Sequence, residues 1–248
     1  MLKPRIVPLL AAALLTSVTL LSWIWIVPMA LDMYGPMTGP SAWMMRTTWD
    51  VRYTALIWLM WAVMMAAMML PTAAPLVLLY ARATSARDGA VLRLAALIAG
   101  YLSVWGAFSA AATALQRFLS ASLMVTPMME MASRRGAGAL LVLAGAYQFT
   151  PAKIACLRAC RSPMSFVMRR TGAGAGTALR LGLEHGAYCL GCCWALMLLL
   201  FAGGVMNLSV IVTLTAVVLV EKVMPFGEHT SRAIGVALLG LGVWTLWS

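Results

Sequence analysis

Charge and histidine are both scarce in this sequence. Only 10% of its 248 residues are charged and 63% are hydrophobic, against about 25% and about 45–50% in soluble domains. A chain of this size has too little interior to bury so large an apolar fraction. A water-soluble enzyme, a disordered chain and a disulfide-stapled secreted module are therefore excluded. With two histidines and seven acidic residues, no Ser-His-Asp, HExxH or paired-carboxylate arrangement occurs, so we assign no catalytic residue and favour a binding protein over an enzyme.

Long apolar runs make up most of the sequence, and its mean hydropathy is +0.92. A membrane-spanning helix needs about 20 mostly apolar residues. On that rule the sequence predicts an all-α fold, a polytopic transmembrane helix bundle made of one integral membrane domain over residues 1–248. Its seven expected spans lie near 6–31, 53–80, 91–115, 137–160, 179–202, 205–223 and 232–247.

The fourth expected span and the connection after it have unusual compositions. Pro151 interrupts the span, but a membrane bundle tolerates a proline kink, so we expect the helix to continue to Cys160. The following inner connection, 161–178, contains a glycine-alanine run at 171–176. This run lacks the Gly-Lys-Ser/Thr of a phosphate-binding loop, and we interpret it as a flexible linker.

The distribution of positive charge along the chain predicts how the protein is oriented in the membrane. A net charge of +11 would suggest nucleic acid in a soluble protein, but no basic stripe interleaved with aromatic residues accompanies it, so we expect no nucleic-acid partner. Lys and Arg instead collect in cytoplasmic loops of membrane proteins. Most of the 18 Lys and Arg residues, including Lys3, Arg5, Lys153 and Lys222, fall on one side. We therefore expect a cytoplasmic N-terminus.

The strongest local pattern lies in the fifth expected span. Histidine and cysteine recur there at four-residue intervals, which places them on one face of a helix, and one further cysteine lies a turn beyond. Imidazole and thiolate are ligands of zinc, and thiolate is also a ligand of Cu(I). The candidate metal ligands in this span are His185, Cys189, Cys192 and Cys193.

A second cysteine pair, Cys156 and Cys160, has the same spacing in the fourth span, so all five cysteines lie in two segments. At 1.5 Å per residue, both segments are expected in the cytoplasmic half, where structural disulfides are disfavoured. Glu221 approaches the same depth and is a further candidate ligand; a boundary ion pair between Glu221 and Lys222 is the alternative. Cysteine also serves as a small apolar packing residue, and that interpretation stays open.

Methionine is the second pattern, with 20 residues in all. In the second expected span Met60, Met64 and Met68 recur at helical spacing, with Met65 and Met69 beside them. Thioethers suit Cu(I) because they are soft and need no deprotonation. Met64 and Met68 are therefore candidate ligands on a path from the methionine-rich outer loop over 32–52. Methionine is also a flexible filler of helix interiors, which is the alternative.

Six blocks of the sequence form a recognisable combination. They are 60–72, Gly100-Tyr101 with Trp105, 147–163, 185–194, 204–207 and 221–225. Together they resemble a bacterial family of unknown function described as predicted metal-binding integral membrane proteins, and the resemblance covers roughly residues 50–230. It implies a metal and a bacterial cytoplasmic membrane, with ligands among the cysteine, histidine and methionine positions above.

Three functions are compatible with these patterns. The first is a membrane protein that binds, and transports or delivers, a soft metal ion, with copper favoured and zinc an alternative. The second is a thiol–disulfide redox protein, because Cys189 and Cys192 have the CxxC spacing of redox pairs. The third is an accessory subunit of a larger membrane complex. The expected partners are the lipid bilayer, the metal ion and, for the third function, other membrane subunits.

Overall fold

The computed structural model describes residues 6–37, 40–45, 48–170 and 174–247, and the chain is helical throughout these ranges apart from its connections and one isolated β-bridge between Val125 and Met131. Two of the charges used to predict the orientation, Lys3 and Arg5, lie outside the described residues, as does part of the glycine run. The helices are α1 (Ile6–Met33), η1 (Pro40–Met45), α2 (Val51–Thr84), α3 (Ala90–Ala121), α4 (Arg134–Tyr147), α5 (Pro151–Cys160), α6 (Pro163–Arg170), α7 (Ala175–Gly203), α8 (Leu208–Val223) and α9 (Gly227–Trp247).

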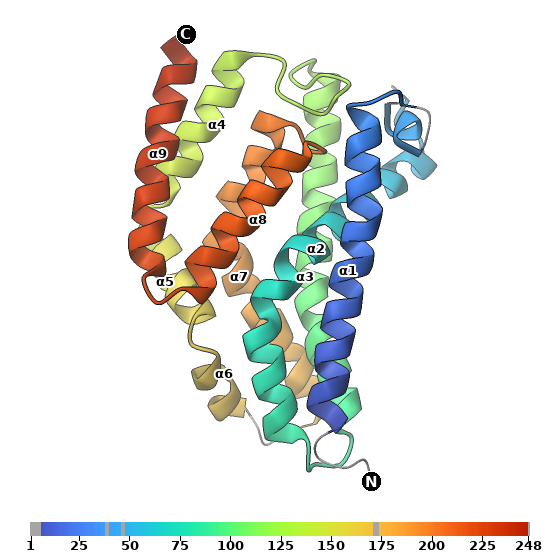
Figure 1. Ribbon diagram of the computed structural model, residues 1–248, viewed down its shortest axis with the longest axis vertical. Helices are drawn as coiled ribbons and strands as arrows, with labels where there is room; N and C mark the ends of the chain where they lie inside the picture. The colour runs from blue at the N-terminus through green and yellow to red at the C-terminus, as the bar shows by residue number, and fades with distance from the viewer. Residues whose placement is uncertain (1–5, 38–39, 46–47, 171–173, 248) are drawn as a thin grey trace.

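Five of these helices (α1, α2, α3, α7 and α9) are long and apolar enough to cross a membrane, and α4 and α5 together would make a sixth, bent span. The expected span at 205–223 is the exception. Its helix, α8, has 16 residues, which at 1.5 Å per residue is about 24 Å, less than the roughly 30 Å of a bilayer core. The start of α1 and the end of α9 lie at opposite ends of the bundle (Figure 1).

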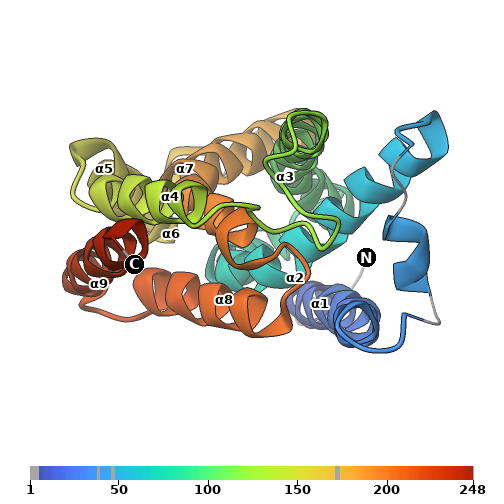
Figure 2. The ribbon, with the colours of Figure 1, turned by 90° about the horizontal axis from the view of Figure 1, so that it is seen from above.

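The helices α2 and α7 are the inner helices of the bundle. In each, 56% of the most apolar window is buried, against 22% in α1 and 17% in α9. Seen along the bundle, α1 and α8 lie on one side, α3 and α7 on the other, and α2 between them, with α4 and α9 together at one end (Figure 2). Cysteines on α7 and methionines on α2 therefore face the interior of the molecule.

Two glycines let α3 and α7 approach closely. A Cβ atom on Gly182 would overlap the carbonyl oxygen of Leu97, and one on Gly100 would overlap that of Leu179. Small residues at such crossings are typical of membrane helices, where close backbone packing drives association. This contact fixes α7 against α3 just below the cysteine-bearing turns.

The expected span over 137–160 is present, but its kink at Pro151 is a complete break between two helices. The helices α4 and α5 meet at an angle of 67°, because Pro151 has no N–H to continue the helix and begins α5 instead. Thr150 caps the new helix, its hydroxyl accepting a hydrogen bond from the Lys153 N–H at 3.2 Å. The bend turns Gln148 inward, where it is 1% exposed.

Part of the inner connection is helical. Residues Pro163–Arg170 form α6, and α7 already begins at Ala175. Positions 171–173 of the glycine run lie outside the described residues, so its interpretation as a flexible linker stays a prediction. In the outer loop, the short helix η1 places Met44 in the interior, 1% exposed.

Candidate metal centre

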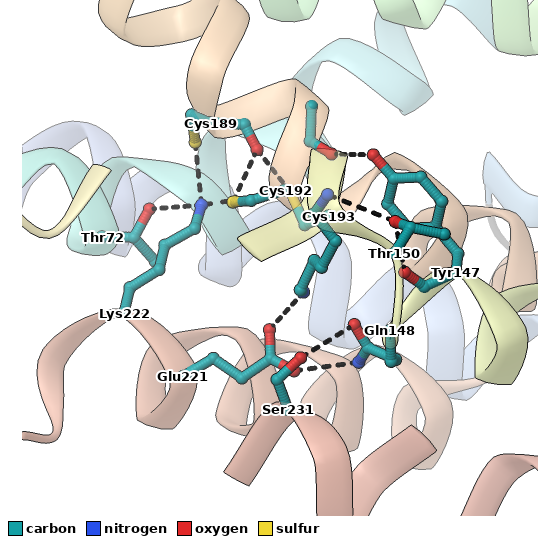
Figure 3. A network of polar contacts seen from close by, with 12 residues as sticks. Thr72, Tyr147, Gln148, Thr150, Cys189, Cys192, Cys193, Glu221, Lys222 and Ser231 are labelled. Atoms are coloured by element: carbon teal, nitrogen blue, oxygen red, sulfur yellow. Dashed lines mark hydrogen bonds and ion pairs between the residues drawn. The ribbon is translucent and has the colours of Figure 1, made fainter. Parts of the chain in front are cut away.

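The side-chain ammonium of Lys222 lies among sulfur atoms in the interior of the bundle (Figure 3). Its Nζ atom is 2.8 Å from Cys189 Sγ and 3.9 Å from Cys193 Sγ. From α2, Thr72 Oγ1 lies 3.5 Å and Met69 Sδ 4.0 Å from the same nitrogen. Lys222 is 8% exposed, so a buried cation is surrounded by thiols, a thioether and a hydroxyl.

Two further thiols belong to this cluster. Cys192 Sγ lies 3.1 Å, and Cys193 Sγ 2.9 Å, from the Cys189 carbonyl oxygen, to which both thiols donate. The Cys160 thiol, at the end of α5, lies close enough to those of Cys189 and Cys192 to interact with them. The predicted meeting of sulfur from two helices is thus present for Cys160, Cys189, Cys192 and Cys193, which we call the thiol cluster.

Cys156 lies one turn away from the thiol cluster. Its Sγ atom packs against the backbone of Gly191 on α7, 2.7 Å from where a Cβ atom would stand. The neighbouring carbonyl group of Gly191 accepts a hydrogen bond from the Tyr147 hydroxyl at 2.6 Å. Cys156 therefore supports the packing of α5 on α7, and its thiol does not reach Lys222.

Tyr101 connects the thiol cluster to His185. The Tyr101 hydroxyl oxygen is 3.1 Å from Cys189 Sγ and donates to the Met69 carbonyl at 3.0 Å. Its ring lies over that of His185, with 5.9 Å between centroids. His185 is 3% exposed, one helical turn before Cys189. The predicted stripe of His185, Cys189 and Cys193 therefore faces the interior.

The alternative of an ion pair between Glu221 and Lys222 is wrong. The Glu221 carboxylate instead contacts Lys153 Nζ at 2.6 Å and accepts from Gln148 Nε2 at 2.9 Å. Ser231 on α9 donates to the Gln148 amide oxygen at 3.3 Å. Lys153 is 0% and Glu221 1% exposed, so Lys153 and Lys222, counted above as inner-side surface charges, are interior groups. Their burial is possible because each ammonium has polar or ionic partners.

The methionines of α2 line the interior next to the thiol cluster. Met64 and Met68, predicted as ligands, are 0% exposed and belong to the core. The methionine sulfur near Lys222 is that of Met69, which the helical spacing placed beside the row of Met60, Met64 and Met68. At the outer end, Met44, Met45 and Met129 line a cavity of about 430 Å³ together with Trp49 and Tyr53.

Three residues at this centre were not predicted from the sequence as site residues: Lys222, Tyr101 and Met69. For Lys222 a usable signal existed, because an ionisable residue at the end of an apolar helix is a functional candidate. Within the described ranges, no three His, Cys, Asp or Glu side chains form a ready-made metal-ion site. The described residues are therefore not arranged as a closed four-ligand zinc site. The Lys222 ammonium lies between the thiols instead.

Comparison with known proteins gives one finding that bears on this centre. No curated protein and no solved structure matches the chain. One family model matches residues 58–245, a range that includes every residue of the thiol cluster and Lys222, and that family is described as PpoB2, copper chaperone. Because the match extends over most of the chain, this protein belongs to the PpoB2 copper chaperone family.

Proposed function

We propose that this protein binds Cu(I) at the thiol cluster and hands it to an acceptor, as a multi-pass protein of a bacterial cytoplasmic membrane with its N-terminus inside. The observation that carries the proposal is the convergence of Cys189 and Cys193 on one buried cation, at 2.8 and 3.9 Å. A position that holds a cation among sulfur atoms has the chemistry that a soft metal cation needs.

The ligand set favours Cu(I) among the metals of the cell. Thiolate and thioether sulfur select Cu(I), whereas carboxylate and carbonyl oxygen select harder ions. The nearest carboxylate, Glu221, is held by Lys153 and Gln148 and is not available to the cluster without breaking that network. Cys189 and Cys193 are the proposed primary ligands, with the Met69 thioether beside them.

An excess of thiols supports delivery rather than storage. The Cys160 thiol lies near that of Cys189, and Cys192 Sγ is 3.1 Å from the Cys189 carbonyl oxygen. An ion bound by two sulfur atoms therefore has further sulfur atoms nearby. Exchange of one thiolate for another moves the ion without leaving it bare in a low-dielectric interior. An ion can therefore pass from α7 to Cys160 at the end of α5.

A path from the outer end is proposed along α2. The cavity that contains Met44, Met45 and Met129 is also lined by Tyr53 of α2, two helical turns before the first buried methionine of this helix. From there the thioethers of Met60, Met64 and Met68, each 0% exposed, continue to Met69 at the thiol cluster. Neutral sulfur ligands can hold a monovalent soft ion along such a path without adding charge.

A Cu(I) titration tests the proposal. Purified protein is titrated anaerobically with Cu(I) against a chromophoric competitor, and the same is done for Cys189→Ser/Cys193→Ser and for the control Cys156→Ser. We expect tight binding in the wild type, loss in the double variant and retention in the control. Absence of tight Cu(I) binding by the folded wild type, or equal binding by the double variant, contradicts the proposal.

A further inference from the structure

Lys222 has no carboxylate partner among the side chains described around its ammonium. The carboxylate next to it in the chain belongs to Glu221, which is bound by Lys153 and Gln148. The groups at the ammonium are the Cys189 and Cys193 thiols, the Thr72 hydroxyl and the Met69 thioether. An ammonium buried in this way needs a nearby negative charge, and sulfur is the atom placed to carry it.

The charges of the surrounding groups can be counted. The Lys153–Glu221 pair is neutral as a unit. His185 counts as neutral imidazole, the form in which histidine ligates metals, and the Tyr101 hydroxyl at Cys189 is also neutral. The fixed charge at the thiol cluster is therefore the single positive charge of Lys222.

We propose that Lys222 is the counter-cation of a two-thiolate complex and thereby makes the site select a monovalent soft ion over a divalent one. This inference rests on the proposed function, namely that Cys189 and Cys193 bind copper. Two thiolates and Cu(I) carry a net charge of minus one, which Lys222 neutralises. Two thiolates and Zn(II) are already neutral, so Lys222 leaves one positive charge uncompensated in the interior.

The size of this preference for a monovalent over a divalent ion follows from Coulomb's law. One unit charge about 6 Å from the metal, at an effective dielectric of about 20, changes the relative affinity for two ions that differ by one charge roughly 100-fold. Cu(I) and Zn(II) are suited to the comparison because both have filled d shells, so neither has a geometric preference from d electrons. Ag(I) and Cd(II) form a second such pair.

The test compares the ratio of Cu(I) to Zn(II) affinity in the wild type, Lys222→Gln and Lys222→Arg. Glutamine keeps much of the side-chain length without charge, and arginine stays charged. We expect the ratio to fall about 100-fold in Lys222→Gln and to fall much less in Lys222→Arg, because arginine keeps the positive charge. A general loss of affinity cancels in the ratio.

A measurement on the wild type alone keeps the inference testable if the variants do not fold. Its Ag(I)/Cd(II) affinity ratio is compared with that of a small dithiol in the same buffer, and we expect it to be about 100-fold higher. The inference is overturned if the protein and the small dithiol have equal Ag(I)/Cd(II) ratios. It is also overturned if folded Lys222→Gln keeps the Cu(I)/Zn(II) ratio of the wild type, which is the outcome if zinc recruits a third thiolate. In both cases tight Cu(I) binding by the wild type leaves the proposed function standing, whereas its absence removes both.

Discussion

Glu221 and Lys222 are adjacent in the chain, yet their side chains join different interior networks. Glu221 contacts Lys153 at 2.6 Å, and Lys222 contacts Cys189 at 2.8 Å. Successive residues on a helix point about 100° apart, so the end of α8 presents one charge toward α5 and the other toward α7. The two networks are adjacent, and no hydrogen bond between the described side chains joins them, so the partners of Lys222 are the sulfur atoms and the Thr72 hydroxyl.

The first prediction concerns the buried ion pair. Glu221→Gln leaves the Lys153 ammonium without its carboxylate and should lower the free energy of unfolding by about 3–5 kcal/mol, the usual cost of breaking a buried pair. Lys153→Met/Glu221→Gln should lose less than Glu221→Gln alone. Thermal unfolding in detergent measures both. Arg158→Ala, which breaks the exposed pair of Arg158 with Glu228, is the control and should leave Tm unchanged; an equal loss in all three variants contradicts the prediction.

The second prediction concerns the crossing of α3 and α7. Gly182→Ala places a methyl group against the Leu97 carbonyl, which belongs to the backbone and cannot rotate away, and should destabilise the protein by about 1–3 kcal/mol. The control is Gly106→Ala on α3, where nothing lies within 4 Å of the added atom. That change should be neutral or stabilising. Detergent-phase melting curves compare the two, and a Gly182→Ala protein as stable as the control would show that the helices are not in close contact.

The third prediction concerns the hydroxyl group at Cys189. Tyr101→Phe removes the hydroxyl that lies 3.1 Å from Cys189 Sγ. Once copper binding converts Cys189 to a thiolate, this hydroxyl can turn its proton from the Met69 carbonyl to the thiolate, so its loss should weaken Cu(I) binding about 10-fold, the effect of roughly one hydrogen bond to a charged group, while the stoichiometry stays the same. Tyr53→Phe deletes a comparable buried hydroxyl, bonded to the Met44 carbonyl at 2.8 Å, far from the thiol cluster. Competition titrations should show no change in affinity for this control.

The fourth prediction compares two methionines of α2: Met69, next to Lys222, and Met64, farther along the proposed path. Met69→Leu replaces the thioether nearest Lys222 by a side chain of similar volume and should lower the equilibrium affinity for Cu(I). Met64→Leu should leave that affinity unchanged but slow the entry of Ag(I) into protein held in vesicles. Equilibrium titration and stopped-flow uptake are the two measurements. Equal affinities for Met69→Leu and the wild type would remove Met69 from the site.

Part of the candidate site could be inferred from local spacing alone. Four-residue intervals put His185, Cys189 and Cys193 on one face of α7, and all three are buried in the structure. The spacing of Cys156 and Cys160 was equally regular, but Cys160 joins the thiol cluster and Cys156 lies against Gly191. The difference arises from the 67° bend before α5, which determines which side of that short helix faces α7.

The sequence by itself determined that the chain is an all-helical bundle of apolar spans, because hydropathy and helical period are properties of each segment alone. Only the tertiary structure decided the partners of the buried charges. Lys153 and Glu221 are 68 positions apart in the chain, and Lys222 and Cys189 are 33 apart. Which of them meet depends on how each helix is rotated and where it ends, and packing between helices sets both.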